Sequence, residues 1–237
     1  MDFWNVVARL GEAQILLPAL AVVSACLTWR SAAPRTAAWW LGLTALAALV
    51  TTATKLAFIG WGVGYAPLDV TGISGHATFA AAVLPLLAFA AFPARRVPAL
   101  SAAYALAALI AVSRLATGVH SISEVALGFG LGAAASALAL ALGAMPRTPM
   151  PRWVVIGLLV WMVATPAGAP PSRTHGWVTS LALAMSGRPQ PYTREMKLQQ
   201  WQARRAAAVR ERSSIAAMTT GASDASNSIT STPRISS

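Results

Sequence analysis

Long apolar stretches without charge alternate with short polar connections along most of the chain. Each stretch holds about 16 to 21 residues, close to the 17 to 25 that a bilayer-spanning helix needs. The stretches are rich in Ala and Leu, which favour helix, and they lack the period-two alternation of a membrane barrel strand. They cover residues 13–29, 37–54, 77–92, 97–113, 125–145 and 153–169. The pattern therefore predicts an all-α, polytopic membrane helix bundle with about six transmembrane helices.

Three of the connections carry arginines and no acid. These arginines are Arg30, Arg35, Arg95, Arg96, Arg147 and Arg152. A chain that crosses the membrane back and forth puts the three connections on one side, and the positive-inside rule makes that side the cytoplasm. The N-terminus and the loops at 60–75 and 114–124 are therefore expected on the other side.

Polar segments flank the six predicted spans. The first twelve residues have apolar positions mostly three apart, which predicts a short interfacial helix. The end of the chain is rich in Ser, Thr, Ala and Gly, which is typical of disorder. We expect four segments: an interfacial segment 1–12, a six-span membrane domain 13–169, a partly helical basic tail 170–212 and a disordered tail 213–237.

Composition excludes a soluble fold. Apolar residues make up 56% of the 237 residues and charged residues 11%, whereas an ordinary globular chain carries about 25% charged residues. The net charge of +11 does not indicate a nucleic-acid partner, because eight basic residues follow Gly187 and the others lie scattered between apolar stretches. The single cysteine, Cys26, excludes an intrachain disulfide and a thiolate metal site.

Ionisable and small polar residues gather at the span ends on the non-cytoplasmic side. They are Lys55, Ser74, Gly75, His76, Arg114, His120 and Glu124. Arg offers a planar fork that matches phosphate oxygens, and a helix N-terminus capped by Ser74 presents backbone amides to an anion. Two histidines can supply a nucleophile and a proton donor. These residues therefore predict a phosphate-binding site with acid and nucleophilic chemistry.

The spacing resembles that of the type 2 phosphatidic acid phosphatase superfamily, in particular its bacterial membrane lipid phosphatases. The family pattern is K-x6-R-P, P-S-G-H and S-R-x5-H-x3-D. Ser113-Arg114, His120 and Glu124 follow the third motif with one conservative change, and Ser74-Gly75-His76 follows the second. The resemblance covers about residues 55–132.

Four positions depart from the pattern. Gly62 and Val63 replace the arginine and proline of the first motif, so one phosphate contact is missing. Ile73 replaces the proline before Ser74, and Glu124 replaces the aspartate.

The resemblance implies an enzyme that removes phosphate from a lipid phosphate or diphosphate, phosphatidate-like or isoprenyl. It implies that His120 attacks phosphorus to form a phosphohistidine, that Glu124 orients the imidazole and that His76 protonates the leaving oxygen. The residues implied to bind the phosphoryl oxygens are Lys55, Ser74, Gly75 and Arg114. No metal or other cofactor is implied, because the cationic side chains stabilise the charge of the transition state. The implied location is a bacterial inner membrane, with the site facing the periplasm or exterior.

Some of these residues also have simpler interpretations. Ser121-x-x-Glu124 is a capping box for the helix that follows. His120 and Glu124 have the spacing of a metal pair, although no third ligand follows at helical spacing. Asp69 structures the outer loop, pairs with a cation there or takes a direct part in catalysis.

Glycines and tryptophans inside the spans have structural interpretations. The glycine-rich run 128–132 imitates a nucleotide-binding loop, but inside a span it predicts close helix packing through Gly128 and Gly132. Four tryptophans near span ends are typical of interfacial belts: Trp39, Trp40, Trp61 and Trp153.

Two other functional classes fit parts of the pattern. A non-catalytic transporter or lipid-binding scaffold is compatible with the missing first-motif arginine, although the polar residues lie at span ends and not at midplane. Vanadium-dependent haloperoxidases share the motifs by family resemblance, but they are soluble and this chain has six apolar spans.

Overall fold

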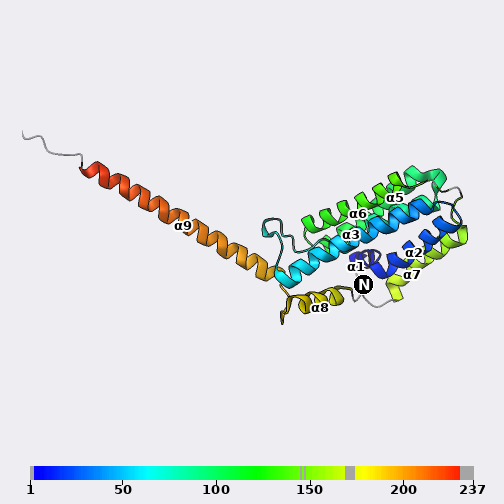
Figure 1. Cartoon of the computed structure of the whole chain (residues 1–237), viewed down its shortest axis with the longest axis horizontal. Coiled ribbons are helices and arrows are strands. Elements are labelled where there is room, and N and C mark those ends of the chain that lie inside the picture. The colour runs from blue at the N-terminus through cyan, green and yellow to red at the C-terminus, as the bar shows by residue number, and fades with distance from the viewer. Residues whose placement is uncertain (1–2, 145, 147, 169–173, 230–237) are drawn as a thin grey trace, which may run out of the picture. The chain divides into compact units, whose positions relative to one another are not determined.

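The computed structural model describes residues 3–144, 146, 148–168 and 174–229, and the chain divides into two units, Met1–Thr193 and Arg194–Ser237. Among these residues every named element is a helix, and one isolated antiparallel bridge joins Tyr65 to Val70. The first unit contains α1 (Phe3–Arg9), α2 (Ala13–Trp29), α3 (Pro34–Trp61), α4 (Gly75–Ala91), α5 (Arg96–Ala116), α6 (Ile122–Leu142), α7 (Arg152–Gly168) and α8 (Thr174–Ser186), with short 3-10 helices η1 (Ala66–Leu68) and η2 (Pro93–Arg95) (Figure 1). The predicted all-α fold is confirmed.

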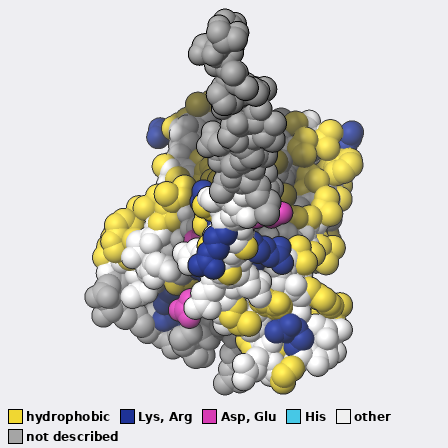
Figure 2. Space-filling model, turned by 90° about the vertical axis from the view of Figure 1, so that its left-hand side faces the viewer, with side chains coloured by type: hydrophobic (Ala, Val, Ile, Leu, Met, Phe, Trp, Pro, Cys, Tyr) yellow, Lys and Arg dark blue, Asp and Glu magenta, His cyan; other side chains and the backbone are white. Residues whose placement is uncertain are grey.

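Six apolar helices coincide with the six predicted spans. Four described segments are long and apolar enough to cross a membrane, namely Phe3–Trp29, Pro34–Trp61, Pro93–Ala116 and Ile122–Leu142. Two shorter apolar helices, Gly75–Ala91 and Arg152–Pro166, complete the set. Hydrophobic side chains cover both flanks of the surface in Figure 2. The first unit is therefore a membrane helix bundle.

Helix α4 forms the centre of this bundle, packed against α2, α3, α5 and α6. Most of its residues are buried. Two glycines bring α6 against it: a Cβ on Gly128 would lie 2.5 Å from the Ser74 carbonyl oxygen, and one on Gly132 would lie 2.2 Å from that of Thr78. The predicted close packing through these glycines is present in the structure.

One predicted interfacial tryptophan is buried instead. Trp40 is fully buried in α3, and its indole N–H donates a hydrogen bond of 2.9 Å to the Ala82 carbonyl oxygen of α4. The interfacial prediction is wrong for this residue, because the indole finds its polar partner inside the bundle. Trp39, Trp61 and Trp153 are exposed, as expected for residues at the membrane boundary.

The segments outside the six spans are helical too. Helix α1 packs against α5 and α7 and buries Val7, Ala8 and Arg9, so it joins the bundle and does more than lie on its surface. Helix α8 packs against the end of α3. In the second unit α9 (Arg194–Ile229) continues past Arg212, where the sequence predicts disorder to begin. Residues 230–237 lie outside the described residues.

Candidate active site

His120 and Glu124 form a hydrogen-bonded pair where α5 ends and α6 begins. His120 lies in the connection between these helices, and Glu124 lies in the first turn of α6. The imidazole Nδ1 is 2.7 Å from Glu124 Oε2, and the Glu124 side chain is fully buried. Because Nδ1 is engaged by the carboxylate, the neutral ring has its lone pair on Nε2.

The same carboxylate caps α6. The Ser121 backbone N–H donates to Glu124 Oε2 at 3.2 Å, and the Glu124 N–H donates to the Ser121 hydroxyl at 3.3 Å. The capping box is therefore present, and the same carboxylate oxygen that accepts the Ser121 N–H also contacts the imidazole.

The other carboxylate oxygen fixes the loop that precedes α4. Glu124 Oε1 accepts hydrogen bonds from the Thr71 N–H at 2.6 Å, the Thr71 hydroxyl at 2.5 Å and the Gly72 N–H at 3.1 Å. Sequence reasoning missed these partners, because no local spacing relates residues 71 and 72 to 124. They immobilise the carboxylate and with it the ring of His120.

Burial makes His120 neutral over a wider pH range than usual. It lowers the pKa of the imidazole below its ordinary value of 6.5. The hydrogen bond to Glu124 opposes that shift, and the positive charges of Lys55 and Arg114 add to it. The ring is therefore in its nucleophilic form at neutral pH.

Ser74, Gly75 and Lys55 meet at the N-terminus of α4. Ser74 occupies the N-cap position, but its hydroxyl makes no capping hydrogen bond, contrary to the expected cap. This hydroxyl is fully buried and has no hydrogen-bond partner in the described structure. A Cβ on Gly75 would lie 3.5 Å from the Lys55 ammonium nitrogen, so the lysine charge lies directly beside the helix N-terminus. The combination suits an oxyanion.

Arg114 and His76 complete the cluster. Arg114 lies in the last turn of α5, and its buried Nε has no hydrogen-bond partner in the described structure. His76 lies in the first turn of α4, within electrostatic range of Lys55, Arg114 and His120. The fold therefore brings together all seven residues that the sequence singled out for the site.

The turn between α1 and α2 packs against this cluster, which sequence reasoning missed. A Cβ on Gly11 would lie 2.6 Å from Ile110 Cγ2 and 3.2 Å from His76 Cβ. Next to it the buried Glu12 pairs with Arg9 at 3.6 Å, and its charge also acts on Arg114. In the sequence, the only sign of this contact was that two charged residues, Arg9 and Glu12, lie close to an apolar span.

The structure shows why a glycine stands at position 62. Gly62 ends α3 with φ +68°, a conformation that favours glycine. The Tyr192 ring lies 3.0 Å from the position of an added Cβ, so a side chain at position 62 would require this ring to shift. The guanidinium carbon of Arg188 lies over this ring, 4.2 Å from its centroid.

Asp69 and the histidine–carboxylate pair are the other acidic and metal-binding candidates in the sequence. Asp69 ends η1 in the left-handed conformation, and the carboxylate partner of His120 is Glu124. Across residues 3–229, apart from the undescribed positions, no three His, Cys, Asp or Glu side chains group as a metal site requires.

Residues 63–147 match the family model described as the PAP2 superfamily. A protein of Klebsiella pneumoniae, described as an uncharacterized 22.5 kDa protein in cps region, is 36% identical over 211 residues, which cover 84% of this chain and 99% of that protein. The chain belongs to the PAP2 superfamily. Membership supports a phosphatase activity, and the matched segment contains every residue of the cluster except Lys55. No solved structure matches the chain.

Proposed function

We propose that the protein is a membrane-embedded phosphatase that hydrolyses a lipid phosphate or diphosphate through a phosphohistidine intermediate. The observation that carries the proposal is the buried His120–Glu124 pair beside two cations and two buried donors. These donors, the Ser74 hydroxyl and Arg114 Nε, have no hydrogen-bond partner among the described residues. Buried polar groups are normally hydrogen-bonded, so these donors call for a ligand that accepts. A phosphoryl group supplies the acceptor oxygens and the negative charge that Lys55 and Arg114 balance.

In the first step, Nε2 of His120 attacks phosphorus and the bond from phosphorus to the leaving oxygen breaks. His76 donates a proton to that oxygen, and the lipid alcohol leaves, or the lipid monophosphate when the substrate is a diphosphate. The negative charge of the bound phosphate favours the protonated form of His76 that this step needs. Glu124 stabilises the positive charge that develops on the His120 ring.

In the second step, water attacks phosphorus and the bond between phosphorus and His120 breaks. His76 takes the proton from the water, inorganic phosphate leaves and His120 returns to its neutral form. Lys55, Arg114, Ser74 and the N-terminal amides of α4 stabilise the equatorial oxygens in both steps, so the protein supplies the positive charge without a metal ion.

The site is proposed to face away from the cytoplasm, at the periplasmic or exterior surface of a bacterial inner membrane. The arginine-bearing connections all lie at the opposite ends of the helices from the cluster, which supports this orientation. Single cysteines at Val70 and Ala94, each in a Cys26→Ser background, test it with a membrane-impermeant thiol reagent. We expect labelling from outside at position 70 and from inside at position 94, and the reverse pattern overturns the orientation.

Phosphate release by the detergent-purified protein tests the activity. The panel contains phosphatidate, phosphatidylglycerol phosphate, an isoprenyl phosphate and an isoprenyl diphosphate. We expect release from at least one of them, unaffected by chelators and inhibited by vanadate, which mimics five-coordinate phosphorus. Release from none of the panel contradicts the proposed function.

A further inference from the structure

Helix α9 carries most of its basic residues on one face. Between Arg194 and Arg212 it contains six basic residues and two acids, Glu195 and Glu211, which leave a net charge of +4. Because successive residues of a helix are about 100° apart, five of the six basic residues fall within an arc of roughly 100°. We call this arc the basic stripe, and it consists of Arg194, Lys197, Arg204, Arg205 and Arg212. Arg210 lies on the opposite face.

The positive charges of the basic stripe are not balanced by acids of the same helix. Side chains three and four residues apart meet on a helix surface, where opposite charges stabilise the helix and like charges destabilise it. No acid stands three or four residues from any residue of the stripe. Arg204, Arg205 and Arg212 are exposed. The stripe therefore presents a positive surface that suits an anionic partner.

An indole lies in the middle of the basic stripe. Trp201 falls between Lys197 and Arg205 around the helix, and Leu198 and Val209 follow one edge of the stripe. The guanidinium carbon of Arg205 lies over the Trp201 ring, 4.8 Å from its centroid. Tryptophan is enriched where a protein meets lipid headgroups, and a helix with a cluster of about four to eight basic residues is typical of binding to anionic lipid. This composition favours a bilayer surface as the anionic partner.

The chain tethers α9 to the membrane boundary. The Tyr192 N–H donates a hydrogen bond of 2.9 Å to the carbonyl oxygen of Ile59, in the last turn of the membrane-spanning helix α3. Only Thr193 separates Tyr192 from Arg194, the first residue of α9. A bilayer surface is therefore within reach of the helix in whatever direction it extends, at the high effective concentration that a short tether gives.

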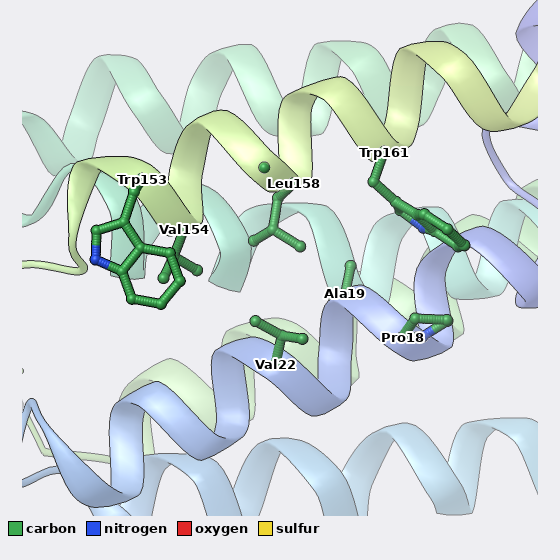
Figure 3. A pocket seen from close by; sticks show the side chains of 8 residues that line it. Pro18, Ala19, Val22, Trp153, Val154, Leu158 and Trp161 are labelled. Atoms are coloured by element: carbon green, nitrogen blue, oxygen red, sulfur yellow. The ribbon is translucent and has the colours of Figure 1, made fainter.

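A pocket on the side of the bundle does not offer a surface of this kind. It lies between α2 and α7, with Trp153 and Trp161 at its two ends (Figure 3), and has a volume of about 310 Å³. Its lining residues are all uncharged. The pocket therefore cannot distinguish an anionic lipid from a neutral one, and such selectivity needs a charged surface such as the basic stripe.

We propose that the basic stripe of α9 binds the anionic headgroup surface of the bilayer that the bundle spans. Its guanidinium groups bind the phosphate oxygens of anionic phospholipids, and Trp201 inserts at the level of the headgroups. The negative surface potential of such a bilayer attracts each basic residue, and salt screens this attraction. Binding therefore depends on anionic lipid and on ionic strength, and it leaves Arg210 facing water.

Access of a water-soluble reagent to two positions of α9 tests the proposal in the full-length protein. Ala208 lies within the arc of the basic stripe and Ala203 on the opposite face, and both are exposed. Each is replaced by Cys in a Cys26→Ser background and labelled with a nitroxide, and the protein is placed in nanodiscs of phosphatidylcholine, with or without phosphatidylglycerol. We expect phosphatidylglycerol to protect position 208 from a water-soluble paramagnetic reagent and to leave position 203 accessible.

Two variants with the same loss of charge provide the matched comparison. Arg205→Gln removes a charge from the stripe, whereas Arg210→Gln removes one from the opposite face of the same helix. We expect Arg205→Gln to lower the ratio of protected to accessible nitroxide at position 208 about fivefold, which corresponds to about 1 kcal/mol for one basic residue at an anionic surface. Arg210→Gln should leave this ratio nearly unchanged.

Equal protection of position 208 in neutral and anionic nanodiscs overturns the proposal, and so do equal effects of the two variants. Protection should fall as salt is added, because salt screens the attraction. Protection that persists at high salt indicates apolar contact and contradicts binding by charge. Protection by added DNA or an acidic peptide, without protection by phosphatidylglycerol, assigns the stripe to an acidic macromolecule and also overturns the proposal.

Discussion

The imidazole Nδ1 of His120 lies 2.7 Å from Oε2 of Glu124, an oxygen that also accepts the Ser121 N–H at the start of α6. The cap of a helix and the orientation of the proposed nucleophile therefore depend on one carboxylate. Its second oxygen holds Thr71 and Gly72, so the loop before α4 is tied to the same group. This carboxylate therefore fixes the proposed binding residues of α4 in position relative to the proposed nucleophile, which precedes α6.

Replacing Glu124 by Gln distinguishes its orienting role from its capping role, because the two roles affect turnover and stability to different extents. The amide oxygen can keep the bonds from Thr71 and Gly72, but the NH2 group then faces two donors, the Ser121 N–H and the ring of His120. We expect turnover to fall by about 10⁴, as for loss of the orienting carboxylate in a serine–histidine arrangement. The lost cap costs only about 1 kcal/mol. Phosphate release and the thermal midpoint in detergent check both effects, and a variant with full turnover and reduced stability refutes the orienting role.

Ser74→Ala should weaken phosphate binding and leave the fold intact. The Ser74 hydroxyl is buried without a partner in the described structure, so removing it costs no internal hydrogen bond. Loss of one hydrogen bond to a charged ligand should raise the inhibition constant of vanadate roughly tenfold to hundredfold.

Thr78→Val is the control for Ser74→Ala and should behave in the opposite way. The Thr78 hydroxyl donates to the Ser74 carbonyl oxygen at 2.9 Å, one turn from the site. We expect it to lose about 1 kcal/mol of stability with little change in vanadate inhibition. Unchanged inhibition in Ser74→Ala contradicts the proposed ligand contact.

Much of this arrangement follows from the sequence. The apolar stretches predict the six helices, and their alternation across the membrane predicts that Lys55, His76, Arg114 and His120 meet at one face. Contacts between remote segments could not be predicted. The local sequence pattern does not predict the contact of Glu124 with Thr71, the contact of Tyr192 with Gly62 or the burial of Trp40. These contacts depend on how the helices pack against each other, and the helical period alone does not determine that packing.

The two glycines of the run at 128–132 that face α4 should tolerate no side chain. A Cβ on Gly132 would lie 2.2 Å from a backbone oxygen, whereas Gly130 has nothing within 4 Å. Gly132→Ala should therefore destabilise the bundle by about 1–3 kcal/mol or more, and Gly130→Ala should leave it unchanged or slightly stabilised. Thermal midpoints in detergent compare the pair, and equal midpoints would show that α4 and α6 are not packed this closely.

The protonation of His120 should begin below its ordinary pKa. Burial lowers the pKa of the ring below 6.5, so the neutral, reactive form persists as the pH falls through that value. In a protein with His76→Asn and His175→Asn, His120 is the sole histidine. The rate of its carbethoxylation should have a midpoint below pH 6.5, and adding Lys55→Met should raise that midpoint, because the Lys55 charge lowers the pKa. A midpoint at or above 6.5 contradicts the buried, cation-flanked site.

Phosphate release by His120→Ala tests the central claim most directly. The matched control is His175→Ala, because His175 is exposed on α8 and has no role in the proposed chemistry. Both proteins are compared with the wild type on the same lipid phosphate. We expect the thermal midpoints of both variants to lie close to that of the wild type. We predict that His120→Ala releases phosphate at the background rate and that His175→Ala releases it at the wild-type rate. Release by His120→Ala at near the wild-type rate would contradict a mechanism in which this histidine attacks phosphorus.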